Sequence, residues 1–221
     1  MRARLPDLKV NFMSTTFNSV IKTEQELREI LGHPNEIVTN KTITKLDDIC
    51  LNFIAAARFL TIASADSQGN MDVSPKGDYA GFVQVLDDRT LVIPDRPGNK
   101  KGDTLTNILQ NPKVGLLFMI PGVRETLRVN GYAKIVTDAN LLETMKYKNK
   151  LPLFGIVVHV EEIFMHCAKC IVRSGLWAGE SESTTAAIPT LGEALVQHTQ
   201  FSIDAADLDV AIRLDEETNL Y

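Results

Sequence analysis

The sequence predicts a mainly β protein, built on a small antiparallel barrel or sandwich with flanking helices. Two observations support this prediction. Short apolar runs rich in β-branched residues recur through the middle of the chain, and turn residues separate them at hairpin spacing. Only one short helical pattern interrupts these runs, which argues against a parallel sheet with helical crossovers. Counted in this way, the chain has six or seven antiparallel strands.

Composition and charge restrict the class of protein. The 221 residues are 44% hydrophobic and 23% charged, as in an ordinary globular chain, and the formal net charge is −5. An acidic balance argues against a general nucleic-acid partner, which would favour basic residues. The longest apolar stretch, Val114 to Ile120, is too short to span a bilayer. We therefore expect neither a nucleic-acid nor a membrane partner.

Three regions follow one another along the chain. Residues 1–20 have two arginines but no apolar core like that of a signal peptide, which indicates a flexible arm or a wrongly chosen start codon, and a cytoplasmic protein. Residues 21–178 hold the strands, preceded by helices predicted at 23–32 and 45–57. Residues 179–221 form a polar linker and a helical tail that is predicted to begin near Leu191.

The strands are predicted from turn to turn. "RFLTIASAD" and "MDVSPKGD" flank the turn at 67–70, and Pro75 places the second run at an edge or a bulge. "GFVQVLDDRTLVIPD" holds two further strands around its Asp-Asp turn. After the short helix come "KVGLLFMI" and "ETLRVNGYAKIV", then a helix predicted at 138–149, and finally "GIVVHVEEIFMHC".

Cysteine usage points to no special chemistry. Cys50, Cys167 and Cys170 are few and odd in number, so a disulfide scaffold is not expected. The C-x-x-C in "HCAKC" lacks the further ligands of a structural zinc site, and it lacks the strand-turn-helix setting of a thioredoxin-like site. We expect ordinary thiols and no metal site.

Two lysines lie at the unfavourable end of the short helix. The helix is predicted over 103–110 and ends at Asn111-Pro112, so Lys100 and Lys101 lie at its amino end. That end carries a partial positive charge, which makes it a natural anion site. Gly98 and Asn99 tolerate unusual backbone angles, so the backbone N–H groups near them can converge on a ligand. We expect this ligand to be a phosphate. The alternative is that both lysines extend into water.

"DVSPKGD" adds candidates for the same anion. If this strand lies beside the one ending at Pro94, Ser74 and Lys76 can face the phosphate. For Lys76 alone, an exposed turn lysine is the competing interpretation.

Three segments carry a resemblance to a known family: "FLTIASADSQGNMDVSPKGD", "TLVIPDRPGNKKGDTLTNILQNPKVGLLF" and "ETLRVNGYAKI". Together they resemble the FMN-binding split barrels related to pyridoxamine 5′-phosphate oxidase. The chain is especially similar to a bacterial subfamily of uncharacterised proteins that are expected to depend on FMN. The resemblance covers roughly residues 21–177 and includes "ELREILG" and the late "HCAKCIVRSGLW".

The resemblance implies a set of FMN contacts. Lys100 and Lys101 match an arginine-lysine pair that grips the phosphate, and two lysines keep its charge but lose the arginine fork. Thr126 matches a glutamine with a longer reach, and "RSGLW" matches a segment that approaches the pocket across a dimer interface. The full implied set is Ser74, Lys76, Ile93, Pro94, Asp95, Asn99, Lys100, Lys101, Thr126, Arg173 and Trp177.

The resemblance also implies a function. The expectation is an FMN-dependent oxidoreductase that acts on a small-molecule substrate as a homodimer, with the flavin site at the interface. The Arg-x-His segment of true pyridoxamine phosphate oxidases is not visible, which counts against that substrate. No catalytic acid or base stands out. The alternatives are a barrel that holds flavin or haem without turnover, and an enzyme that uses a deazaflavin instead of FMN.

Overall fold

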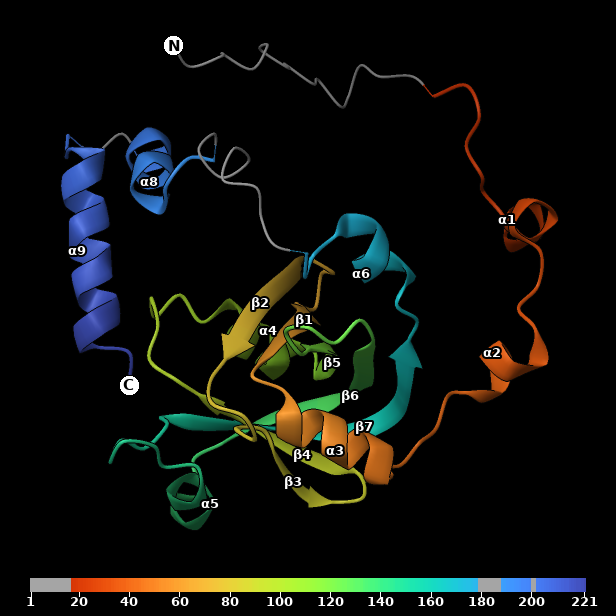
Figure 1. The fold of residues 1–221 in the computed structure, drawn as a ribbon, viewed down its shortest axis with the longest axis horizontal. Coiled ribbons are helices and arrows are strands. Elements are labelled where there is room, and N and C mark those ends of the chain that lie inside the picture. Colours follow the sequence, from red (N-terminus) through yellow and green to blue (C-terminus); the bar gives the residue numbers. More distant parts are fainter. Residues whose placement is uncertain (1–16, 179–187, 200–201) are drawn as a thin grey trace. The chain divides into compact units, whose positions relative to one another are not determined.

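A computed structural model describes residues 17–178, 188–199 and 202–221 (Figure 1). The chain divides into two compact units, of which the first spans 1–40 and 181–188 and the second spans 41–180 and 189–221. The first unit contains α1 (Glu24–Leu31) and α2 (Glu36–Asn40). The second contains the strands β1 (Phe59–Ala65), β2 (Met71–Gly77), β3 (Gln84–Asp87), β4 (Thr90–Asp95), β5 (Lys113–Met119), β6 (Thr126–Val136) and β7 (Phe154–His166), and the helices α3 (Asp48–Ala56), α4 (Asp103–Gln110), α5 (Ala139–Thr144), α6 (Lys169–Ser174), α8 (Leu191–Thr199) and α9 (Ala205–Thr218).

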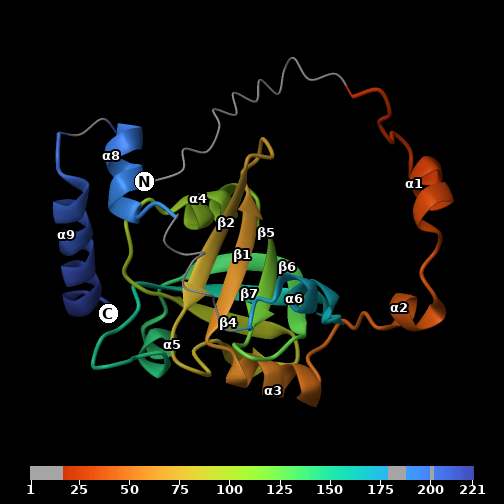
Figure 2. The same ribbon diagram turned by 45° about the horizontal axis from the view of Figure 1, so that its top comes forward.

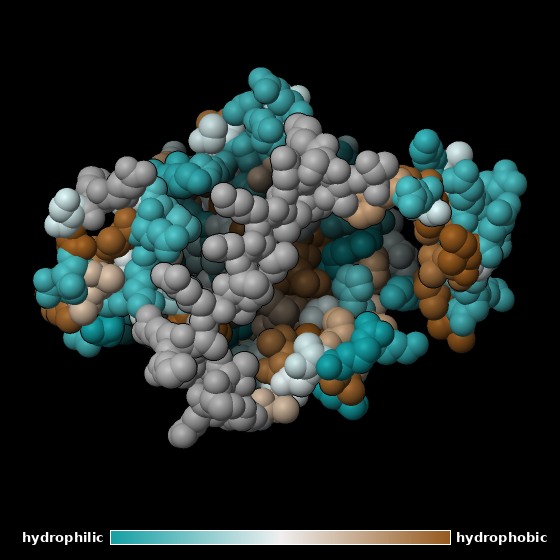
Figure 3. Space-filling model, turned by 90° about the horizontal axis from the view of Figure 1, so that it is seen from above, coloured by the Kyte–Doolittle hydropathy of each residue, from teal (hydrophilic) through white to brown (hydrophobic). Residues whose placement is uncertain are grey.

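In the first unit, α1 has the ends that the sequence predicts. Thr23 and Glu26 form the reciprocal capping box, and Gly32 closes the far end with a positive φ of 76°. Neither helix of this unit has a buried residue among those described. Ile30 and Ile37 are exposed apolar side chains of this unit. Figure 3 shows hydrophobic residues next to hydrophilic ones on the surface of the chain.

The seven strands form one antiparallel sheet in the order β2-β1-β5-β6-β7-β4-β3. The sheet curls so that helices lie across its ends, with α4 over one end and α3 across the other (Figure 2). This arrangement is a mainly β split barrel, as predicted, with seven strands. Because β2 lies at one edge of the sheet, Pro75 removes no hydrogen bond from a second neighbour.

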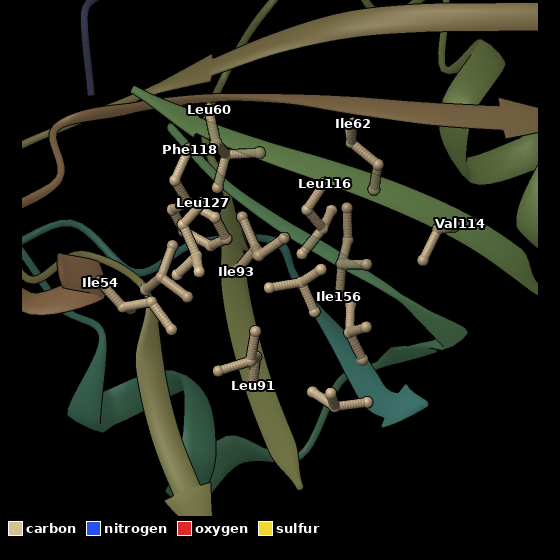
Figure 4. Packing of buried hydrophobic residues seen from close by; sticks show 14 of the residues in the cluster. Ile54, Leu60, Ile62, Leu91, Ile93, Val114, Leu116, Phe118, Leu127 and Ile156 are labelled. Carbon is tan, nitrogen blue, oxygen red and sulfur yellow. The ribbon is translucent and has the colours of Figure 1, made fainter. Parts of the chain in front are cut away.

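Alternating side chains fill the interior of the barrel. Leu60 and Ile62 of β1, Leu91 and Ile93 of β4, and Leu127 of β6 are all fully buried and converge on one cluster (Figure 4). Helix α3 contributes Cys50 and Ile54 to the cluster, and α4 contributes Ile108. The core therefore fixes both end helices relative to the strands.

Two helical predictions need correction. The helix predicted at 138–149 ends at Thr144, because Lys148 and Asn149 adopt positive φ angles of 44° and 64° and form a tight turn. The helix predicted at 45–57 begins after its cap, Asp47, and runs from Asp48 to Ala56. By contrast, the prediction for α4 matches the observed helix at both ends.

Candidate functional site

A cavity of about 530 Å³ lies where the sheet is split. Its walls come from the inner face of β2, the loop between β4 and α4, the first turn of α4 and the start of β7. The lining residues are 72–76, 95–105, 153 and 154. The two edge regions of the sheet thus meet here without pairing, and the lysine loop predicted from sequence forms one wall.

Strand β2 turns its polar side chains inward. Ser74 lies directly opposite Ile62, and Lys76 directly opposite Leu60, in the register with β1. Directly opposed residues in an antiparallel pair share a face, so Ser74 and Lys76 point to the same side as the core residues of β1. The outward face carries Met71 and Val73, which are 68% and 63% exposed. The usual alternation is therefore reversed on this edge strand.

The loop before α4 has unusual backbone geometry. Lys100 adopts a left-handed φ of 61°, and Gly102, the N-cap of α4, has a φ of 69°. The Asn99 Oδ1 accepts a hydrogen bond of 3.0 Å from the Lys101 N–H. Non-glycine residues with positive φ are uncommon and concentrate at functional sites. The chain thus presents both lysines on a bent segment at the amino end of the helix.

Two side-chain hydrogen bonds fix the position of α4. The Thr104 hydroxyl donates to the Asp72 carboxylate of β2 at 2.7 Å. The buried Asn107 amide donates to the Ser64 hydroxyl of β1 at 3.1 Å. Because both partners lie on the sheet, the amino end of α4 is held over the cavity.

Carboxylates neutralise much of the positive charge in the cavity. Lys76 pairs with Asp95 at 3.3 Å, which bridges β2 and β4 across the split. Lys101 pairs with Asp103 at 2.6 Å, and this hydrogen bond, together with Coulomb attraction to the same carboxylate, raises the pKa of Lys101. Among the described residues Lys100 has no carboxylate partner. Of the cations that line the cavity, Lys76, Arg96 and Lys101 are paired with carboxylates, so an incoming anion can approach Lys100 most directly.

Six of the predicted residues line the cavity together: Ser74, Lys76, Asp95, Asn99, Lys100 and Lys101. Ile93 and Pro94 lie next to Asp95 on β4, but both are buried. Ile93 packs in the barrel core (Figure 4), and it does not line the cavity.

The other three predicted residues do not line this cavity. Thr126 is 5% exposed at the start of β6, opposite His166. Arg173 is exposed on α6. The Trp177 ring nitrogen donates to the Val123 carbonyl at 2.8 Å, which holds the exposed indole against the β5–β6 loop.

Sequence reasoning did not include Arg96 in the site. Its Nε donates to the Asp78 carboxylate at 2.6 Å, and its Nη2 donates to the Met145 carbonyl at 2.9 Å. Arg96 also lines the cavity next to Asp95. Its position directly after a predicted contact was the available signal, but neither partner is close to it in sequence.

A second hollow, of about 540 Å³, lies on the β1–β5–β6 face near Lys113 and Glu161. These two residues form an ion pair of 2.7 Å on the surface. None of the eleven predicted contacts lines this hollow.

The fold and the cationic cavity at its split define a split-barrel protein of the flavin-binding type. Residues 46–167 match the family sequence profile described as pyridoxamine 5′-phosphate oxidase. The match spans more than half of the chain, which belongs to the pyridoxamine 5′-phosphate oxidase family. None of the curated proteins matches it significantly.

Similar solved structures include HupZ from Group A Streptococcus, with 23% identity, a TM-score of 0.45, and coverage of 54% of this chain and 93% of that one. General stress protein 26 from Bacillus anthracis has 17% identity and a TM-score of 0.40, covering 52% and 88%. An F420 reductase has 18% identity and a TM-score of 0.38, covering 51% and 93%. With such low scores, these likenesses carry no argument about function.

Proposed function

We propose that the chain binds FMN in the cavity at the split and acts as an FMN-dependent oxidoreductase on a small molecule. The observation that carries this proposal is the convergence of Lys76, Lys100 and Lys101 at the amino end of α4, in a cavity of ligand size. Membership of a family whose members typically bind flavin supports the choice of cofactor.

In this proposal each wall of the cavity contributes different contacts to the bound FMN. Lys100 and Lys101 hold the phosphate with the free N–H groups of the first turn of α4. Ser74 and Lys76 approach it from β2, and Asn99 and Asp95 shape the loop and the opposite wall. When bound, the flavin supplies the hydride and electron chemistry, and the protein supplies binding and orientation.

The homodimer is part of the same proposal. Arg173 and Trp177 are exposed and lie outside the cavity of their own chain, so in this proposal they contact the flavin of a second copy. The outward face of β2 exposes Met71 and Val73 beside the cavity, and apolar side chains of this kind favour a protein interface.

The first test is an ultraviolet–visible spectrum of the purified protein, before and after heat release of any ligand. Two flavin bands that survive desalting, with FMN in the released fraction, are the expected result. A Soret band would indicate that the protein binds haem and not flavin. A released deazaflavin would identify the cofactor as a deazaflavin, and the proposed phosphate contacts would stay the same. A colourless protein that also leaves the fluorescence of added FMN unquenched would contradict the proposal.

The double variant Lys100→Ala/Lys101→Ala tests the phosphate contacts. Each charge-assisted contact contributes about 1.5 kcal/mol or more, so the Kd for FMN should rise about a hundredfold. The matched control is Lys134→Ala/Lys169→Ala, which removes the same charge from exposed positions outside the cavity. Fluorescence titration measures both. Equal Kd values for the two double variants would overturn the assignment.

A further inference from the structure

The side chain of Tyr221, which follows α9, occupies a site next to the cavity. Its hydroxyl donates a hydrogen bond of 2.8 Å to the Asp78 Oδ1. Its ring lies 4.8 Å from that of Tyr147, tilted by 51°. The site is therefore built from the residue after β2 and the turn after α5, and it accepts both the ring and the hydroxyl of a phenol.

Asp78 provides a fixed acceptor. Its side chain is only 1% exposed, and the Arg96 Nε donates to its second carboxylate oxygen at 2.6 Å. The Tyr79 N–H donates to the Oδ1 at 2.9 Å. A carboxylate held in this way has lone pairs left for one more donor, and in the structure the Tyr221 hydroxyl fills that place.

Aromatic and cationic groups surround the ring. Tyr147 is stacked on Tyr79 with the ring centroids 4.5 Å apart. The Arg96 guanidinium lies 5.6 Å from the Tyr221 ring centroid, and the Lys148 ammonium lies 5.1 Å from it. Such distances give cation–π attraction to an electron-rich ring. The turn at 147–150 holds Tyr147 through two backbone hydrogen bonds between its end residues.

The segment that precedes Tyr221 contains the helices α8 and α9. Helix α9 has no buried residue, and it packs mainly against α8. The hydroxyl and the ring of Tyr221 connect this segment to Asp78 and Tyr147 of the barrel, and a free ligand of the same chemistry can compete with them.

We propose that Asp78, Arg96 and Tyr147 form a binding site for a small hydroxyaryl compound, which Tyr221 fills in the free protein. The ligand places its ring against Tyr147 and donates its hydroxyl to Asp78. Because Arg96 lines both this site and the larger cavity, the bound ring lies beside the larger cavity. The inference does not require flavin in that cavity.

The pKa of Tyr221 agrees with this role. Burial, and then the hydrogen bond to Asp78, raises it to about 12. The hydroxyl therefore remains a proton donor across the physiological range, as the site requires of any ligand that replaces it.

The test uses the full chain with Tyr221→Ala and 4-methylphenol as the probe. Calorimetry should give a Kd of about 1 mM for the variant, a reasonable affinity for so small a ligand. The wild-type chain should bind the probe at least about twofold more weakly, because the tethered Tyr221 competes at an effective concentration of about 1 mM or more, which equals or exceeds this Kd. Toluene, which lacks the hydroxyl, should bind the variant at least about tenfold more weakly than 4-methylphenol.

Equal binding of 4-methylphenol to both chains, or equal binding of 4-methylphenol and toluene to the variant, would overturn the inference. Undetectable binding to the folded variant would do the same. A second measurement needs no variant: in the wild-type chain with labelled tyrosines, saturating 4-methylphenol should move the Tyr221 ring signals to their solvent-exposed positions. Tyr221 signals that do not move at saturation would contradict the displacement.

Discussion

The ion pair between Lys101 and Asp103 opposes the binding of an anion at the head of α4. Asp103 occupies the first position of α4, where its negative charge interacts favourably with the helix dipole. The same carboxylate forms the ion pair with Lys101. Binding of a phosphate requires this carboxylate to release Lys101. The same holds for Asp95 and Lys76, whereas Lys100 can engage the phosphate directly.

We predict that Asp103→Asn tightens FMN binding about two- to fivefold. The range follows from the modest free energy of an exposed ion pair, because the released lysine then pairs with the phosphate alone. The control is Asp88→Asn, which breaks the ion pair with Lys45 outside the cavity. Fluorescence titration at constant ionic strength measures both variants. Weaker binding by Asp103→Asn would mean that the carboxylate helps the ligand.

His166 should make the stability of the fold depend on pH. Burial, then the positive charges of Arg128 and Lys41, lower the pKa of His166 below 6.5 in the folded chain. The neutral ring therefore stabilises the fold above pH 6.5, and this contribution is lost as the pH falls through the folded pKa.

In the variant His166→Gln, the free energy of unfolding should decrease less steeply as the pH falls below 6.5. Urea unfolding at several pH values measures the slope. The matched control makes the same substitution at His198, which is exposed on α8 and far from His166 in the chain. An unaltered slope in His166→Gln would assign the dependence to other groups.

At the scale of single elements, a bulge at Glu161 of β7 brings the backbones of β6 and β7 unusually close. The register between β6 and β7 shifts between Asn130 and Gly131. A Cβ on Gly131 would lie 2.0 Å from the His159 carbonyl oxygen. Since that atom belongs to the backbone of a central strand, it cannot move aside as a flexible side chain would.

Accordingly, Gly131→Ala should lower the free energy of unfolding by about 3 kcal/mol, at the upper end of overpacking effects. Gly98→Ala is the control, because a Cβ there meets no atom within 4 Å. Chemical denaturation of both variants measures the difference. A Gly131→Ala chain as stable as Gly98→Ala would contradict the close approach.

The sequence predicts those elements whose signals are local. Helix α4 has a glycine before it and a proline after it, and both ends were predictable. The end of α5 was not, because a lysine and an asparagine with positive φ replace the expected last turn. Which side chains of β2 point inward could not be predicted, because this depends on the register of β2 with β1. The contacts of Arg96 and Tyr221 could not be predicted either, because both residues bind Asp78, which lies far from them in sequence.

At the scale of the whole molecule, the proposed dimer predicts a mass in solution. Light scattering should give twice the chain mass of 24.5 kDa. Replacing the exposed Met71 of β2, which does not line the cavity, by Lys should shift the protein toward the monomer and weaken FMN binding, because the partner's contacts are lost. A wild-type chain that is monomeric at micromolar concentration with FMN bound would contradict the interface site.

Among the described residues, no helix combines the length and the apolar character that crossing a bilayer requires.

The order of the strands also has a consequence for folding. Strand β4 pairs with β7, although α4, β5, β6 and α5 lie between them in the chain. Closing such a long loop is entropically costly, and barrels dominated by non-local pairs fold in milliseconds to seconds. During synthesis β2 and the lysine loop emerge early, yet β4 gains its second neighbour only when β7 has emerged. The cavity at the split is therefore one of the last parts of the barrel to be completed, because a nascent chain that stops before Leu153 has the lysine loop but lacks the wall formed by Leu153 and Phe154.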